Sequence, residues 1–311
     1  MFADVATRAY DPARRQPADG AAAADLASRM PRLVARAREI AASLAYGVHG
    51  RKRAGVGETF WQYRPFASGE AAHRIDWRRS ARGDQLYVRE REWEAAHDYF
   101  LWMDCSPSMA YGSSLATDDK LSRAVTLGLA LADVLVRGGE RAAALGLTAP
   151  VSARDVIDRL ARALAENAMA AAHDDLPPQA PLRPRARVVL ISDFLVEPDA
   201  LAARLRRFAD AGASGAILMV TDPSEETLPF SGETVFLDTD GGAAFHAGDA
   251  RSLRAAYARR FEAHRDAVRR AAQRVGFSFL QHRTDRPAAE AALALAMGLL
   301  GSDGVGFEER C

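Results

Sequence analysis

The feature that most constrains this chain is an apolar run, residues 99–103, that stops abruptly at Asp104 and is followed by Ser106 and Ser108. A short apolar run bounded by turn-forming residues is typical of a buried strand. The three polar side chains then lie in the loop at its carboxyl end, where open α/β sheets bind ligands. One carboxylate and two hydroxyls are the hard oxygen donors that Mg²⁺ or Mn²⁺ prefers. The alternative is that these residues only cap the next helix.

From residue 98 onward, short apolar runs alternate with amphipathic or wholly apolar stretches of helical length. This alternation predicts a doubly wound, mostly parallel α/β sheet of the Rossmann type, with helices on both faces. Strands are expected at 99–103, 142–147, 187–191, 215–220 and 277–281, and helices at 120–136, 153–166, 198–211, 249–274 and 287–299. Residues 233–237 and 243–246 are expected to form a small hairpin.

The region before residue 98 has a different texture. Residues 1–22 are rich in Ala, Arg, Asp and Pro and read as a disordered tail, whereas 24–46 have the three-four apolar spacing of an amphipathic helix. Glycines then punctuate β-like runs up to residue 97. We therefore expect a tail (1–22), an N-terminal helix with a small β-rich module (23–97), an α/β domain (98–301) and a terminal tail (302–311).

Three of the predicted strands are followed by an acid, namely Asp104, Asp193 or Asp222. If the strands are parallel, all three carboxylates lie along one edge of the sheet, and Asp104 faces Asp193 if their strands are neighbours. A cation held by Asp104, Ser106 and Ser108, with Asp193 nearby or reached through water, is the resulting hypothesis. Asp222 precedes Pro223, which is typical of a turn or helix cap.

Catalytic interpretations have less support. A serine nucleophile needs a base, but no histidine lies near Ser106 or Ser108 in the sequence, and the Gly-x-Ser-x-Gly elbow is absent. The seven histidines are scattered without metal-ligand spacing, and no phosphate-binding glycine loop is present. A metal-dependent hydrolase that uses the same acids is the alternative function.

Charge and cysteine usage narrow the cellular context. Lys+Arg and Asp+Glu balance at 41 each, and an arginine and aromatic cluster at residues 74–91 is interleaved with acids. Mixed signs favour a salt-bridged structural module over a nucleic-acid surface, which is the other interpretation.

Two cysteines and no apolar stretch of membrane-spanning length lead us to expect a cytoplasmic protein without membrane insertion.

The loop from Asp104 to Met109 resembles the Asp-x-Ser-x-Ser signature of von Willebrand factor A domains, their metal-ion-dependent adhesion site. The chain more specifically resembles the bacterial domain-of-unknown-function family fifty-eight, over roughly residues 30–300. The segments that carry this closer resemblance are 55–60, 63–69, 75–82, 88–90 and 191–194. The residues that match the upstream family motifs, with a structural or partner-binding role, are Arg64, Asp76, Trp77, Ser80 and Arg82.

This resemblance implies a von Willebrand A-like domain preceded by a small β-rich module. It also implies a non-enzymatic interaction role beside a MoxR-type AAA+ ATPase, in chaperone-like maturation of a client protein. Its metal ligands correspond to Asp104, Ser106, Ser108 and Asp193, for Mg²⁺ or Mn²⁺. The threonine of the middle metal motif is absent, since residues 171–176 read Ala-Ala-His-Asp-Asp-Leu, which leaves Asp174 or Asp175 as alternative donors.

Overall fold

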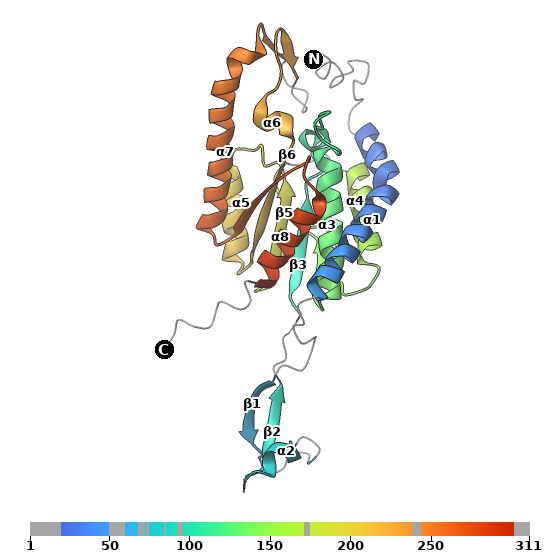
Figure 1. Ribbon diagram of the computed structural model, residues 1–311, viewed down its shortest axis with the longest axis vertical. Helices are drawn as coiled ribbons and strands as arrows, with labels where there is room; N and C mark the ends of the chain where they lie inside the picture. The colour runs from blue at the N-terminus through green and yellow to red at the C-terminus, as the bar shows by residue number, and fades with distance from the viewer. Residues whose placement is uncertain are drawn as a thin grey trace. The chain divides into compact units, whose positions relative to one another are not determined.

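Figure 1 shows the computed structural model of the protein. It describes residues 20–49, 60–67, 72, 75–83, 85–91, 96–170, 175–237 and 244–301. The chain divides into two compact units, one made of residues 1–44 and 97–311 and the other of residues 45–96.

The larger unit is built on a five-stranded parallel sheet with the strand order β4-β3-β5-β6-β9. The fold is therefore the doubly wound, parallel α/β fold that the sequence predicts. Its central strands are buried along nearly their whole length, as expected for a parallel sheet covered on both faces. The strands are β3 (Asp98–Met103), β4 (Arg141–Ala144), β5 (Arg187–Ser192), β6 (Ser214–Thr221) and β9 (Ser278–Arg283).

Helices cover both faces of this sheet, and each face has its own apolar core. On one face lie α3 (Lys120–Arg137), α4 (Val156–Ala170) and α8 (Ala288–Gly301), and on the other α5 (Pro198–Asp210) and α7 (Arg254–Arg274). The predicted burial of the helix at 120–136 is confirmed, since every residue of α3 from Lys120 to Leu135 is buried. Among the described residues, no helix has the length and apolar character required to cross a bilayer.

The N-terminal helix α1 (Gly20–His49) corrects the predicted domain boundary. We expected it to belong with the β-rich module, but residues up to 44 belong to the unit that contains the sheet. The reason is its apolar stripe, which includes Leu26, Leu33 and Ala37 and is buried in the same core as α3 and α4. Ion pairs also join Arg29 to Asp119, the N-cap of α3, and Arg38 to Asp158 of α4. Figure 1 shows α1 beside these two helices.

The smaller unit contains an antiparallel pair, β1 (Phe60–Pro65) and β2 (Tyr87–Arg91), and a short helix, α2 (Trp77–Ser80). Asp76 caps α2, since its carboxylate accepts a hydrogen bond from the Arg79 N–H at 3.0 Å. The Ser80 hydroxyl donates to the Asp76 carbonyl and accepts from the Tyr87 N–H, which ties the helix to β2. This is a small β-rich module, as expected.

Several element ends differ from the prediction for local reasons. The strand expected at 142–147 ends at Ala144, because Gly146 takes the left-handed φ of 76° and Thr148 turns back to bond the Ala144 N–H. The helix expected from residue 249 starts as a 3-10 turn, Ala250–Leu253, before α7. The expected tail 1–22 overlaps α1 from Gly20, and residues 1–19 and 302–311 lie outside the described residues.

A short helix and a separate two-stranded hairpin follow β6 in the chain. The predicted hairpin is confirmed as β7 (Thr234–Phe236) paired antiparallel with β8 (Phe245–Ala247), although its glycine turn lies outside the described residues. The turn expected at Asp222 opens a short helix, α6 (Pro223–Thr227).

Candidate functional site

The candidate site lies at the carboxyl ends of β3 and β5, which are neighbours in the sheet. From β3 the chain moves outward to β4, then crosses back over β3 to form β5 on its other side. The two strands therefore flank the point where the winding direction reverses, and such a switch point opens a crevice for ligands. Asp104 and Asp193 follow these two strands, so the condition on which the sequence-based expectation depended, that their strands are neighbours, is met.

The predicted oxygen donors converge in this crevice. The Ser106 and Ser108 hydroxyl oxygens lie 3.2 Å apart, and the Ser108 hydroxyl donates to Asp193 Oδ2 at 2.9 Å. Asp104 accepts from the Ser106 N–H at 2.8 Å and from the Ser192 hydroxyl at 2.6 Å. Hydrogen bonds thus link the four predicted donors in one series, from Asp104 to Ser106, from Ser106 to Ser108 and from Ser108 to Asp193.

Asp104 is deeply buried in this cluster, with only 1% of its surface exposed. Burial raises the pKa of its carboxyl from the ordinary 3.8 to about 7, against the opposing effect of hydrogen bonds from Ser192 and Ser106. The neighbouring negative charge of Asp193 adds to the rise. A cation in the crevice would favour the ionised form of this carboxyl.

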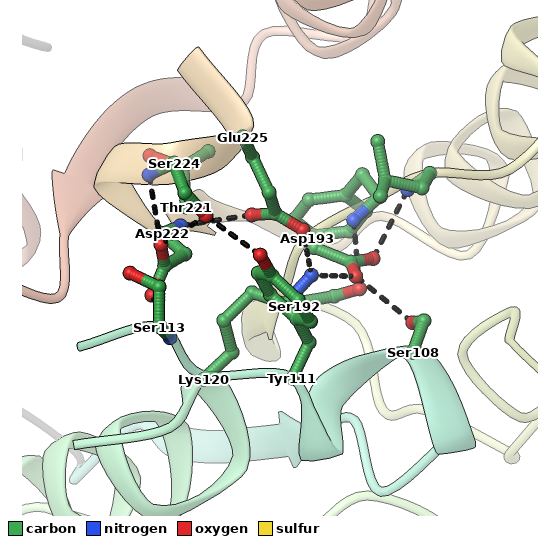
Figure 2. Close-up of polar contacts among 12 residues, drawn as sticks. Ser108, Tyr111, Ser113, Lys120, Ser192, Asp193, Thr221, Asp222, Ser224 and Glu225 are labelled. Atoms are coloured by element: carbon green, nitrogen blue, oxygen red, sulfur yellow. Dashed lines mark hydrogen bonds and ion pairs between the residues drawn. The ribbon is translucent and has the colours of Figure 1, made fainter. Parts of the chain in front are cut away.

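Sequence reasoning missed two charged members of the site, Lys120 and Glu225. The Lys120 ammonium lies 2.7 Å from Asp193 Oδ2 and also contacts Glu225 Oε1, as Figure 2 shows. Burial opposes the charged form, but Asp193 and Glu225 outweigh it and hold the pKa of Lys120 above 10.5. A signal was present in the sequence, because Lys120 is one of only two lysines and opens a largely apolar helix.

Backbone strain occurs directly after Asp193. Phe194 has a left-handed φ of 51°, which is unusual for a bulky residue and persists only where surrounding structure enforces it. Its ring is fully buried, 6.3 Å from that of Trp102, and its carbonyl accepts a hydrogen bond from His264 at 2.7 Å. This packing holds the turn that aims Asp193 into the crevice.

Asp222, the third strand-end acid, plays the predicted capping role. It accepts hydrogen bonds from the Ser224 N–H and the Ser113 N–H, and Glu225 completes a capping box on α6. Burial raises the pKa of Asp222, but these hydrogen bonds outweigh it and leave the pKa below 3.8. The carboxylate is therefore committed to α6 and to the 111–113 loop.

The oxygen geometry fits a small divalent cation. Mg²⁺ holds six oxygens at about 2.1 Å in an octahedron, so neighbouring ligand oxygens lie about 3 Å apart. The separations of 3.2 Å between the two serine hydroxyls and 2.9 Å from Ser108 to Asp193 match such edges. Among the described residues, no group of three or more His, Cys, Asp or Glu is placed to hold a metal ion, at this site or elsewhere, so the serine hydroxyls are essential to the predicted donor set. Asp174 lies outside the described residues, and Asp175 stays a prediction as a donor.

The family-motif residues of the smaller unit separate into two groups. Asp76 and Ser80 hold α2 on β2, as described above. Trp77 and Arg82 are exposed, Trp77 to 61%, and Arg64 lies in β1 opposite Val88. The acids Asp84, Glu90, Glu92 and Glu94 have side chains outside the described set, so the predicted salt-bridge network there stays a prediction.

Comparison with known proteins agrees with the resemblance seen in the sequence. The profile of a family described as "Protein of unknown function DUF58" matches residues 62–267, and the chain belongs to this family. Uncharacterized proteins from Mycobacterium bovis and Mycobacterium tuberculosis are 29% identical to it over 247 residues, covering 75% of this chain and 76% of theirs. A crystal structure of a conserved hypothetical protein, BatB from Bacteroides thetaiotaomicron, aligns with a TM-score of 0.40 and 13% identity. This alignment covers 66% of this chain and all of that one.

Proposed function

We propose that this protein is a non-enzymatic protein-interaction module whose crevice at β3 and β5 binds Mg²⁺ or Mn²⁺. Ser106 and Ser108 would hold the cation directly, with Asp104 and Asp193 beside them, directly or through water. When bound, the cation supplies an open coordination position for a carboxylate of a partner protein. The site would then resemble the metal-ion-dependent adhesion site of von Willebrand A-like domains.

The single observation that carries this proposal is the convergence of the oxygens of Ser106, Ser108 and Asp193 at the ends of β3 and β5, where each lies within 3.2 Å of the next, close enough to be neighbouring ligands of one cation. Burial supports it as well. Asp104, Ser106 and Asp193 are buried, whereas Ser108 is partly exposed. A cation on these oxygens would thus be shielded by protein on one side and reachable by a partner on the other.

The contacts of the two serines favour binding over catalysis. Nucleophilic catalysis requires a base against the hydroxyl. The Ser108 hydroxyl instead donates to the Asp193 carboxylate, and no described histidine hydrogen-bonds to either Ser106 or Ser108. His264 instead hydrogen-bonds to the Phe194 carbonyl.

The partner side of the proposal rests on what the sequence resemblance implies. We propose that the module works in the cytoplasm with a MoxR-type AAA+ ATPase, in chaperone-like maturation of a client protein. The metal-dependent contact would be made to an acidic side chain of the ATPase or of the client. A pull-down from the source cells, with Mg²⁺ or with a chelator, tests this part: a AAA+ ATPase recovered only with Mg²⁺ supports it, and equal recovery contradicts it.

The metal site itself is tested by calorimetric titration of Mg²⁺ and Mn²⁺ into the full-length protein. The test variant is Ser106→Ala/Ser108→Ala, which removes two ligand oxygens without leaving a buried charge unpaired. The matched control is Ser28→Ala, an exposed serine on α1. We expect binding to wild type and to the control, and at least tenfold weaker binding to the double variant. Equal heats in wild type and the double variant, or no binding to wild type, would contradict the proposal.

A further inference from the structure

Lys120 is placed against two ordinary preferences of its residue type. Lysine is almost never fully buried unless it is paired, and a positive charge is unfavourable in the first turn of a helix. Lys120 is nevertheless the first residue of α3 and is only 1% exposed. The site must therefore supply an electrostatic reason for its presence.

Two acids from different strand ends provide that reason. The Lys120 ammonium lies 2.7 Å from Asp193 Oδ2, after β5, and contacts Glu225 Oε1 on α6 (Figure 2). It also lies 5.7 Å from the centre of the Tyr111 ring, within range of a cation–π contact. An internal positive charge thus already occupies the acidic side of the crevice.

The Asp193 oxygen that Lys120 engages is the one that faces the proposed cation. Asp193 Oδ2 accepts from the Lys120 ammonium and also from the Ser108 hydroxyl at 2.9 Å. The other oxygen, Oδ1, accepts the Leu195 N–H. A divalent cation beside Ser108 would compete with the ammonium for the same carboxylate oxygen, and the two positive charges would repel each other at close range.

Glu225 can keep the Lys120 ammonium paired when the Asp193 carboxylate binds a cation. Its Oε2 accepts the Asp222 N–H at 2.8 Å within the capping box, so the carboxylate stays fixed next to Lys120. Tyr111, whose ring lies near the ammonium, is tied to α6 as well, because its hydroxyl forms a hydrogen bond with the Ser224 hydroxyl at 2.7 Å.

We infer that Lys120 is the residue that sets the cation affinity of this site, as a tethered competitor shared between Asp193 and Glu225. The inference rests on the proposed divalent-cation site and adds how its affinity is limited. In the absence of metal, the ammonium neutralises Asp193 and holds the crevice together. When a divalent cation binds, Asp193 turns its charge to the metal and the ammonium relies on Glu225.

The competition predicts opposite effects of two substitutions on Mg²⁺ affinity. Lys120→Met removes the competitor and should tighten Mg²⁺ binding at least tenfold. Glu225→Gln removes the alternative acid and leaves the ammonium to Asp193, so it should weaken Mg²⁺ binding severalfold. Glutamine still serves a capping box, which keeps this second variant foldable if Lys120→Met is not.

The experiment is calorimetric titration of Mg²⁺ into the full-length wild type and both variants. The control is Arg137→Met, which removes a positive charge at the far end of α3 and should change the affinity less than twofold. Opposite shifts in the two variants support the inference. Equal affinities in wild type and in every variant that folds overturn it, while the proposed metal site stands.

The remaining outcomes separate the two proposals. Binding to Lys120→Met but not to wild type supports the competition and contradicts a working cation site in the natural chain. Absence of Mg²⁺ binding from the wild type and from both variants contradicts both.

Discussion

Asp193 and Asp222 follow the adjacent parallel strands β5 and β6, yet their carboxylates have different hydrogen-bond partners. Asp222 accepts hydrogen bonds from the N–H groups of Ser113 and Ser224 and from the Ser224 hydroxyl, and Ser224 belongs to the helix that Asp222 caps. Asp193 has one backbone donor, and its other oxygen faces the Ser108 hydroxyl and the Lys120 ammonium. Donors within a helix cap are fixed in place, whereas the Ser108 hydroxyl and the Lys120 side chain come from separate elements and can be exchanged for a ligand. The partners, and not the residue type or strand position, distinguish a helix cap from a binding site.

Of the substitutions that test this difference between Asp193 and Asp222, Asp193→Ala should lower the free energy of unfolding most. This change leaves the buried Lys120 ammonium with Glu225 alone and removes the acceptor of the Leu195 N–H. Removal of one partner of a buried ion pair costs about 3–5 kcal/mol, so we expect a loss of that size in the free energy of unfolding. Urea unfolding followed by circular dichroism, with a chelator present, measures it. A loss no larger than that of Asp222→Ala would contradict the proposed difference between Asp193, which pairs with a buried ammonium, and Asp222, which caps a helix.

The second prediction concerns pH and Asp104, the other acid of the crevice. Its pKa of about 7 lies above the ordinary 3.8, so between these values the folded protein holds a proton that the unfolded chain has released. The stabilisation from Asp104 is therefore complete below pH 4 and is lost as pH rises through 7, by up to about 4 kcal/mol. In Asp104→Asn this decline should be absent.

The measurement is the difference in unfolding free energy between wild type and Asp104→Asn at several pH values from 4 to 8. The difference is needed because His282, whose pKa burial and Arg123 lower to about 4, makes stability fall toward acid in both proteins. A difference independent of pH would contradict the burial effect on Asp104. Addition of Mg²⁺ at pH 8 should recover wild-type stability and leave the variant less affected, since the cation favours the ionised carboxyl.

The smallest expected effect is that of Asp222→Ala. It removes the cap of α6 and a bond to the 111–113 loop, for which we expect a loss of about 1–2 kcal/mol. Asp222→Asn should restore most of it, because asparagine caps helices as well as aspartate does. Thermal unfolding of both variants provides the test. Mg²⁺ affinity should change less than twofold in either, and a large loss of affinity would place Asp222 inside the site.

Local patterns predicted much of this architecture. The strand at β3 and the buried helix α3 follow from runs of apolar residues, and the sheet class follows from their alternation. The donors Asp104, Ser106 and Ser108 were also predictable, because three residues of the right chemistry stand within five positions after a strand. Asp193 was predictable on the condition that β5 pairs with β3, which it does.

Contacts between distant residues were not predictable in this way. Lys120 meets Asp193 and Glu225 across 73 and 105 positions, and its burial is set by the walls that β5 and α6 build around it. The position of α1 is a second case, because its apolar stripe fits any apolar face of suitable shape. Only the assembled sheet unit showed that α3 and α4 supply that face.

The sequence by itself determined the α/β class, the element order and the oxygen donors after β3, because these depend on spacing and side-chain chemistry along short segments. Only the tertiary structure decided which strands are neighbours, and hence that Asp193 points to Ser108 and that an ammonium stands between two acids. The physical reason is that electrostatic energies depend on distance and burial in space, and both are properties of the folded chain.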